Sequence, residues 1–116
     1  YVKGSDMLAS GQKGEGLKMM EASATYYDQI NYDYGQAVTH SGIGVAYHRM
    51  GDTYKATSHY EACIDAGAQS SSCYNNLAII LIGNESISKA KSIVNDGLKK
   101  YPNASDLKKT KQYLYQ

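Results

Sequence analysis

The chain has no tryptophan and no phenylalanine, so its entire aromatic content is twelve tyrosines among 116 residues. Tyrosine combines a large apolar ring with a polar hydroxyl group, and it suits half-buried positions between helices. The only proline, Pro102, falls at the end of a helical pattern. We interpret the tyrosines as packing residues rather than as parts of a cofactor site.

The chain also has no long apolar run and no excess of one charge. Its longest apolar run, from Leu77 to Ile82, is far shorter than the about 20 residues that span a membrane. Twelve basic and eleven acidic residues leave a net charge of +1. The densest basic group lies near the C-terminus and comprises Lys99, Lys100, Lys108, Lys109 and Lys111. We interpret this group as a solvated helix face, and we expect neither membrane insertion nor nucleic-acid binding.

What the chain does contain is a repeat with a period of 34 residues. Alanines recur at this spacing, each followed four and eight residues later by a larger apolar residue. The three sets are Ala22, Tyr26 and Ile30; Ala56, Tyr60 and Ile64; and Ala90, Val94 and Leu98. A period of this length predicts a stack of similar helical hairpins, none of which can bury its apolar face alone.

The hydrophobic periodicity predicts helices separated by glycine-containing turns. The expected ranges are 37–50, 53–66, 71–82, 87–100 and 105–115, with less distinct helices over 6–11 and 17–31. Gly51 can adopt a positive φ at the end of one helix, and Asp52 can cap the next. Ser86 is expected to cap the helix that starts at residue 87.

Two segments resemble the tetratricopeptide repeat. The first reads Ile43-Gly44-x-x-Tyr47, then Gly51-Asp52, Ala56, Tyr60 and Cys63-Ile64, and the second reads Tyr74-x-x-Leu77-Ala78-x-x-Leu81, then Ala90, Val94, Gly97-Leu98 and Tyr101-Pro102-Asn103. Small residues such as Gly44 and Ala78 let helices approach closely, and large ones such as Tyr47 and Leu81 fill the gaps between them. The turn before Cys73 resembles the related Sel1-like repeats, which are the weaker alternative.

The resemblance implies an all-α fold: a solenoid of about three antiparallel helical hairpins in one domain over 1–116. A degenerate first repeat would cover 3–36, full repeats would cover 37–70 and 71–104, and a capping helix would cover 105–116. The first repeat departs from the family pattern because Lys13 stands where a large apolar residue is expected.

The resemblance further implies a protein-interaction module, either a scaffold or an adaptor, that binds a peptide or a partner protein in a concave groove without any cofactor. The groove would be lined by Val38, Ser41, Val45, His48, Arg49, Asn75, Asn76, Ile79 and Ile82. Asn75 and Asn76 could bond the backbone of an extended ligand with apolar and acidic character. Only Asn76 matches the clamp with which one branch of the family holds a C-terminal carboxylate, so we do not expect that specificity.

Two alternatives stay open at this point. Ile79, Ile80 and Ile82 either form an exposed apolar patch that binds a partner or belong to a helix buried on several sides. The degenerate N-terminal repeat is a poor cap, so the chain could instead self-assemble into a homo-oligomer or belong to a larger array.

Cys63 and Cys73 lie ten residues apart on either side of a predicted turn. They could form a disulfide that joins adjacent repeats, which would indicate an oxidising compartment such as the periplasm or the cell exterior. The other interpretation is two small buried thiols, which would also suit the cytoplasm.

The sequence offers little for catalysis. A zinc site at His59, Cys63 and Cys73 would lack a fourth ligand, so we expect no metal, and a metal-dependent enzyme is only a remote alternative. His40, His48 and His59 are expected on different faces, and no nucleophile elbow or phosphate-binding loop is present. We therefore do not expect an enzyme. His48, placed in the predicted groove, is the expected source of any pH dependence of binding.

Overall fold

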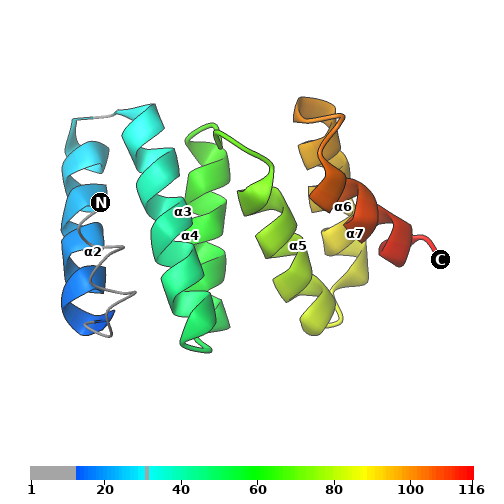
Figure 1. Ribbon diagram of the computed structural model, residues 1–116, viewed down its shortest axis with the longest axis horizontal. Coiled ribbons are helices and arrows are strands. Elements are labelled where there is room, and N and C mark those ends of the chain that lie inside the picture. Colours follow the sequence, from blue (N-terminus) through cyan, green and yellow to red (C-terminus); the bar gives the residue numbers. More distant parts are fainter. Residues whose placement is uncertain (1–12, 31) are drawn as a thin grey trace. The chain divides into compact units, whose positions relative to one another are not determined.

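The computed structural model describes residues 13–30 and 32–116, and these form helices and turns without any strand (Figure 1). The helices are α2 (Lys13–Gln29), α3 (Asp33–Arg49), α4 (Thr53–Asp65), α5 (Ser72–Gly83), α6 (Ile87–Lys100) and α7 (Ser105–Leu114). The predicted all-α class is confirmed for the described residues, and helices pack against each other within each of the units described next. The short helix expected over 6–11 lies outside the described residues.

The chain divides into two compact units. Unit 1 covers residues 1–69 and contains α2, α3 and α4, whereas unit 2 covers residues 70–116 and contains α5, α6 and α7. In unit 1, α3 packs against both α2 and α4, and in unit 2 all three helices contact one another. Each unit therefore has its own interior.

The turn between α3 and α4 forms as the sequence predicts. Gly51 has a φ of 83°, a conformation that glycine adopts without steric cost. The carboxylate of Asp52 accepts a hydrogen bond from the backbone N–H of Lys55 at 3.1 Å and so caps α4. The corresponding prediction for α6 is wrong, because Ser86 makes no side-chain cap bond and the positive φ of that turn, 62°, falls on Glu85.

A glycine lets α3 and α4 approach closely in unit 1. A Cβ atom at Gly44 would lie 2.6 Å from the ring of Tyr60, a separation that side chains do not tolerate. Tyr60 is 1% exposed, and Ile43 and Ala56 are fully buried around it. The small and large residues of the repeat pattern therefore interlock here as predicted.

The predicted register of α2 is wrong. Ala22 is exposed, and Tyr26 and Ile30 are 57% and 51% exposed. The helix instead buries Met20 and Ala24, at 1% and 4% exposure. Since each residue turns a helix by about 100°, a shift of two residues places the expected stripe on nearly the opposite side.

The physical cause is the short connection between α2 and α3. Only residues 30–32 separate these helices, whereas residues 66–71 separate α4 from α5. In addition, α3 begins at Asp33, a full turn before the predicted start at 37. The 34-residue spacing therefore does not extend to the packed face of α2, which meets Gly35 of α3 through the ring of Tyr27.

Tyrosine side chains form a continuous row where α2 meets α3. The ring centroids of Tyr26 and Tyr27 lie 5.6 Å apart, those of Tyr27 and Tyr32 lie 5.6 Å apart, and those of Tyr32 and Tyr34 lie 6.2 Å apart. Tyr26, Tyr32 and Tyr34 are each about half exposed. We call these four residues the tyrosine row.

Unit 2 has an apolar interior along the stripe that the sequence predicts. The buried residues of its three helices are Cys73, Tyr74, Leu77, Ala78, Ile80, Leu81, Ala90, Val94, Gly97, Leu107 and Leu114. A Cβ atom at Gly97 would lie 2.8 Å from Leu107 and 2.9 Å from Tyr74. One glycine of α6 thus lets both α5 and α7 pack against that helix.

Candidate docking groove

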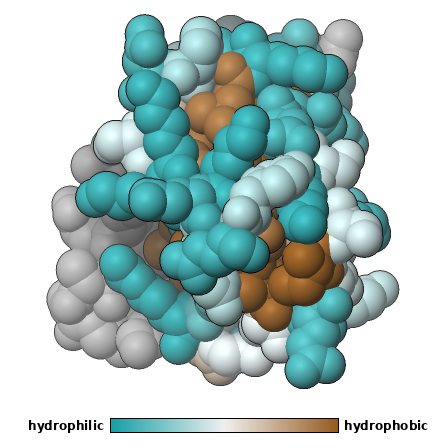
Figure 2. Space-filling view, turned by 90° about the vertical axis from the view of Figure 1, so that its right-hand side faces the viewer, coloured by the Kyte–Doolittle hydropathy of each residue, from teal (hydrophilic) through white to brown (hydrophobic). Residues whose placement is uncertain are grey.

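An open groove of about 320 Å³ lies between α5 and α7 in unit 2. Ile79 and Ile82 of α5 form one wall, and Lys109, Thr110 and Tyr113 of α7 form the other. Ile79 is 46% exposed and Tyr113 is 56% exposed. Figure 2, which faces the end of the chain that carries α7, shows brown apolar surface framed by hydrophilic side chains.

Hydrogen bonds fix α7 beside the first half of α5. The hydroxyl of Ser71, directly before α5, donates to the carboxylate of Asp106, with distances of 2.9 and 3.0 Å to its two oxygens. One turn further, Thr110 donates through Oγ1 to Oδ1 of Asn75 at 2.5 Å. Positions 71, 75, 79 and 82 lie on one face of a helix. On this face, Ser71 and Asn75 are hydrogen-bonded to α7, whereas Ile79 and Ile82 are apolar and line the groove.

The structure resolves the open question about the three isoleucines. Ile80 is 4% exposed and belongs to the interior, whereas Ile79 is exposed and Ile82 is partly so. Of the predicted groove residues in unit 2, Ile79 and Ile82 line the groove, Asn75 is bonded to α7, and Asn76 is partly exposed.

Sequence reasoning missed the contribution of α7, which it treated only as a solubilising cap. The residues that it adds, Lys109, Thr110 and Tyr113, lie beside the inward-facing Leu107 and Leu114. Because Leu107 and Leu114 are seven residues apart, the sequence indicates that they share one face of a packed helix. Residues next to that face, such as Thr110, could have been considered as possible contacts to a neighbouring helix.

The other predicted groove residues belong to α3 in unit 1. Val38, Ser41, Val45 and His48 are partly exposed, and Arg49 is exposed. The His48 ring meets Tyr60 edge-on, with centroids 6.4 Å apart. The His48 imidazole thus takes part in the packing between α3 and α4.

The two units differ in charge. Unit 2 carries seven lysines and three carboxylates, and three of the lysines, Lys108, Lys109 and Lys111, lie on α7. Unit 1 carries five basic and eight acidic residues. The groove between α5 and α7 is therefore an apolar surface on a positively charged unit.

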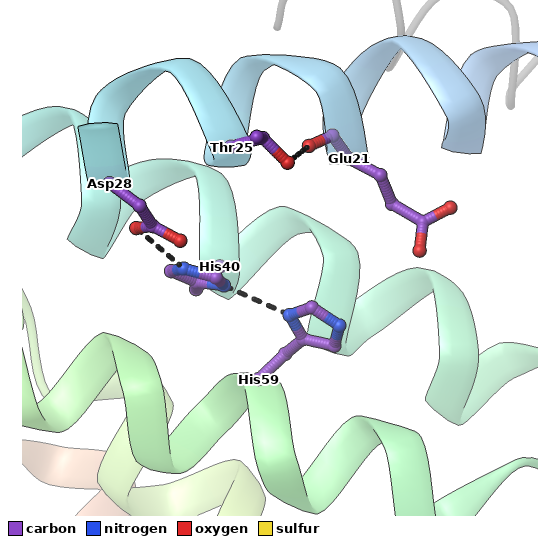
Figure 3. A network of polar contacts seen from close by, with 5 residues as sticks. All are labelled: Glu21, Thr25, Asp28, His40 and His59. Carbon is purple, nitrogen blue, oxygen red and sulfur yellow. Dashed lines mark hydrogen bonds and ion pairs between the residues drawn. The ribbon is translucent and has the colours of Figure 1, made fainter. Parts of the chain in front are cut away.

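A second group of polar residues forms partly buried contacts in unit 1 (Figure 3). Nε2 of His40 lies 3.4 Å from a carboxylate oxygen of Asp28, and Nδ1 of His40 lies 2.9 Å from Nδ1 of His59. These residues come from α2, α3 and α4. The prediction that the histidines lie on different faces is wrong for His40 and His59, because residues on different helices meet when those helices pack together.

Burial changes the titration of His59. Desolvation lowers the pKa of His59 below its ordinary value of 6.5, and repulsion from His40 lowers it further. Beside His40 lies an open hollow of about 430 Å³ whose lining includes Asp28, Asp33 and Asp65. Within residues 13–30 and 32–116, no three His, Cys, Asp or Glu side chains are grouped so that they could hold a metal ion.

Both cysteines are buried, with Cys63 at 1% and Cys73 at 2% exposure, and neither is a free thiol because both are disulfide-bonded. Sulfur in a disulfide is not a thiolate ligand, which removes two of the three residues considered for a zinc site. Of the two interpretations left open by the sequence, two free thiols are thus excluded, and peptide mapping of the unreduced protein will test the pairing of Cys63 with Cys73.

No helix in the described part of the chain is both long and apolar enough to cross a bilayer. Compared with known proteins, the chain matches no family model and shows no significant similarity to a curated protein. Its resemblance to tetratricopeptide repeats therefore depends on the residues quoted above.

Proposed function

We propose that this chain is a non-catalytic protein-interaction module of the tetratricopeptide type, and that the groove between α5 and α7 binds a peptide segment of a partner protein. The observation that carries the proposal is the exposure of Ile79, 46%, inside a groove whose other wall α7 supplies. An exposed apolar surface bounded by polar side chains is typical of an interaction site.

The charge of unit 2 indicates the chemistry of the partner. Lys109 lies in the groove wall, and Lys108 and Lys111 lie on the same helix. A segment that places an apolar side chain on Ile79 and Ile82, with acidic residues beside it, would satisfy both the apolar wall and the lysines.

A peptide library displayed on phage and selected on the immobilised chain tests this function. We expect enrichment of sequences that combine apolar and acidic residues, and loss of that enrichment in Ile79→Glu. The matched control is Ile87→Glu, because Ile87 is 39% exposed on α6, outside the groove. Equal enrichment on both variants would exclude the groove, and enrichment of basic sequences would contradict the partner chemistry.

Self-assembly is the second candidate, and the opposite charges of the two units favour it. Attraction between the acidic unit of one copy and the basic unit of another would weaken as salt is added. Sedimentation analysis at rising protein concentration, in 20 mM and 500 mM salt, distinguishes the candidates. A monomer under all conditions excludes self-assembly and leaves the peptide-binding function as proposed.

A further inference from the structure

The histidine pair of unit 1 joins three helices through side chains. Asp28 of α2 contacts His40 of α3, which contacts His59 of α4 (Figure 3). The two imidazole rings are stacked, with centroids 5.1 Å apart, and the ring of Tyr47 stacks on His59 at 5.7 Å. His40 is 9% exposed and His59 is partly exposed, so the contact between them is partly buried.

Only one hydrogen atom can lie between the Nδ1 atoms of the two rings. If Nε2–H of His40 donates to Asp28, then Nδ1 of a neutral His40 accepts a hydrogen bond from Nδ1–H of His59. Adding one proton to the pair keeps a single hydrogen between the two Nδ1 atoms. When both rings are protonated, two N–H groups and two positive charges face each other across 2.9 Å, and the contact cannot persist.

We propose that the His40–His59 pair is a proton-operated latch, which holds α3 to α4 while the pair carries at most one extra proton and releases them when it takes up a second. The latch is independent of the peptide-binding function, because it lies in unit 1 and the groove lies in unit 2.

Charged and titratable groups on each helix around the His40–His59 pair influence how the pair responds to pH. Asp28 and Glu21 of α2 favour protonation of His59, and Lys55 of α4 opposes it. Tyr47 of α3 faces His59 with its ring and donates its hydroxyl hydrogen to Glu21 at 3.0 Å. Asp33 of α3 and Asp65 of α4 line the hollow beside His40. The carboxylates favour the first proton on the pair, whereas mutual repulsion opposes the second.

The direction of the pH effect follows from linkage. Burial and the charge of His40 lower the pKa of His59 in the folded state, whereas the unfolded chain takes up its proton near the ordinary value of 6.5. The stabilisation is fully present above pH 6.5, and it is lost as the pH falls through the folded-state pKa. Across that interval the folding equilibrium constant of unit 1 should fall about tenfold per pH unit for each additional proton that the unfolded chain binds.

Urea unfolding of the whole chain between pH 7.5 and 5.0 tests the latch, comparing wild type with His59→Asn. Asparagine places an amide near the position of Nδ1 but does not titrate. The matched control is His48→Asn, because His48 also lies on the packed helices of unit 1 but outside the pair. We expect the folding constants of wild type and His48→Asn to fall further over this range than the folding constant of His59→Asn. An equal loss in all three proteins would overturn the proposal.

A second measurement keeps the proposal testable if His59→Asn does not fold. In ¹H–¹⁵N spectra of wild-type imidazoles at pH 8, His40 should carry its proton on Nε2 and His59 on Nδ1. Hydrogen-exchange protection should then decrease below pH 6.5 in α3 and α4 but not in α5 and α6, since unit 2 contains no histidine. The opposite tautomers, or equal decreases in both units, would refute the latch.

Discussion

Units 1 and 2 both pack a tyrosine against a glycine of a neighbouring helix. They differ in the contacts that hold α2 in unit 1 and α7 in unit 2. In each unit a glycine of one helix receives a tyrosine of its neighbour, Gly44 with Tyr60 and Gly97 with Tyr74. In unit 1, polar side chains of α2 reach into the α3–α4 pair through Asp28 and Glu21. In unit 2, a fully buried Leu107 attaches α7, with hydrogen bonds at the edge.

The comparison indicates that the repeat pattern predicts the packing between the two helices of a hairpin better than the packing of a further helix against that hairpin. Unit 1 contains all three histidines and an excess of acidic residues, and it should respond to pH. Unit 2 is basic and keeps an open groove, and it should respond to peptide ligands and salt. Four tests by substitution address this comparison, and one of them changes two glycines.

The largest effect is expected from Leu107→Ala in unit 2. Leu107 is fully buried and lies against Gly97, so truncation leaves a cavity between α6 and α7 that costs about 2–5 kcal/mol. Urea unfolding followed by circular dichroism measures the change. Tyr113→Ala is the control on the same helix, and at 56% exposure it should change stability by no more than about 0.5 kcal/mol. Similar losses in both would show that α7 is not attached through Leu107.

Replacing Gly44 of unit 1 or Gly97 of unit 2 with alanine should lower the stability of that unit. Gly44→Ala forces a Cβ atom against the buried ring of Tyr60, and Gly97→Ala forces one against Leu107 and Tyr74. Each clash should cost about 1–3 kcal/mol, more than the helix propensity of alanine regains.

Gly14→Ala provides the control for these two variants, because no side chain among the described residues lies within 4 Å of a Cβ atom at that position of α2. It should leave stability unchanged or raise it by up to about 1 kcal/mol. If Gly44→Ala were as stable as Gly14→Ala in thermal unfolding, the close approach of α3 and α4 would be disproved.

Tyr47→Phe removes one polar link from α3 to α2. Loss of the hydrogen bond to Glu21 should cost about 0.5–1.5 kcal/mol at pH 7. Burial raises the pKa of Tyr47 above its ordinary value of 10.0, and the bond and charge of Glu21 raise it further. The stabilisation is therefore present below pH 10 and is lost as the pH rises through the folded-state pKa. Stability curves of wild type and Tyr47→Phe should converge at alkaline pH, and parallel curves would contradict this assignment.

Ser71→Ala should have the smallest effect of the four. It removes the hydroxyl that donates to Asp106 at the start of α7, a partly buried contact whose loss should cost about 0.5–1 kcal/mol. Ser88→Ala, at an exposed position of α6, is the control. Hydrogen-exchange rates in α7 should rise in the first variant only, and unchanged rates would show that the apolar contacts alone position this helix.

The sequence predicted the contacts within hairpins well. The α3–α4 turn, the Asp52 cap and the stripe of Tyr74, Leu77 and Leu81 follow from local spacing and turn chemistry. Two positions of the predicted groove, Ile79 and Ile82, lie in the observed one. These features depend on residues close together in the chain, where helical periodicity determines which side chains share a face.

Apart from the start of α3 and the cap of α6, the failures involve the relation of one helix to another. The 34-residue spacing placed Ala22 and Tyr26 in the interior, but the short connection to α3 turns the other face of α2 inward. His40 and His59 are 19 residues apart and meet only because α3 and α4 pack together. No periodicity within a single helix reports such a contact, so these parts of the site required three-dimensional structure.

The tyrosine row at the junction of α2 and α3 makes unit 1 optically distinctive. Rings held 5.6–6.2 Å apart in a fixed chiral arrangement couple their electronic transitions and produce near-ultraviolet circular dichroism. Because the chain lacks tryptophan, no stronger chromophore obscures that signal or drains the excitation energy of the tyrosines. The docking of α2 on α3 can therefore be followed in the unlabelled protein, without adding any probe.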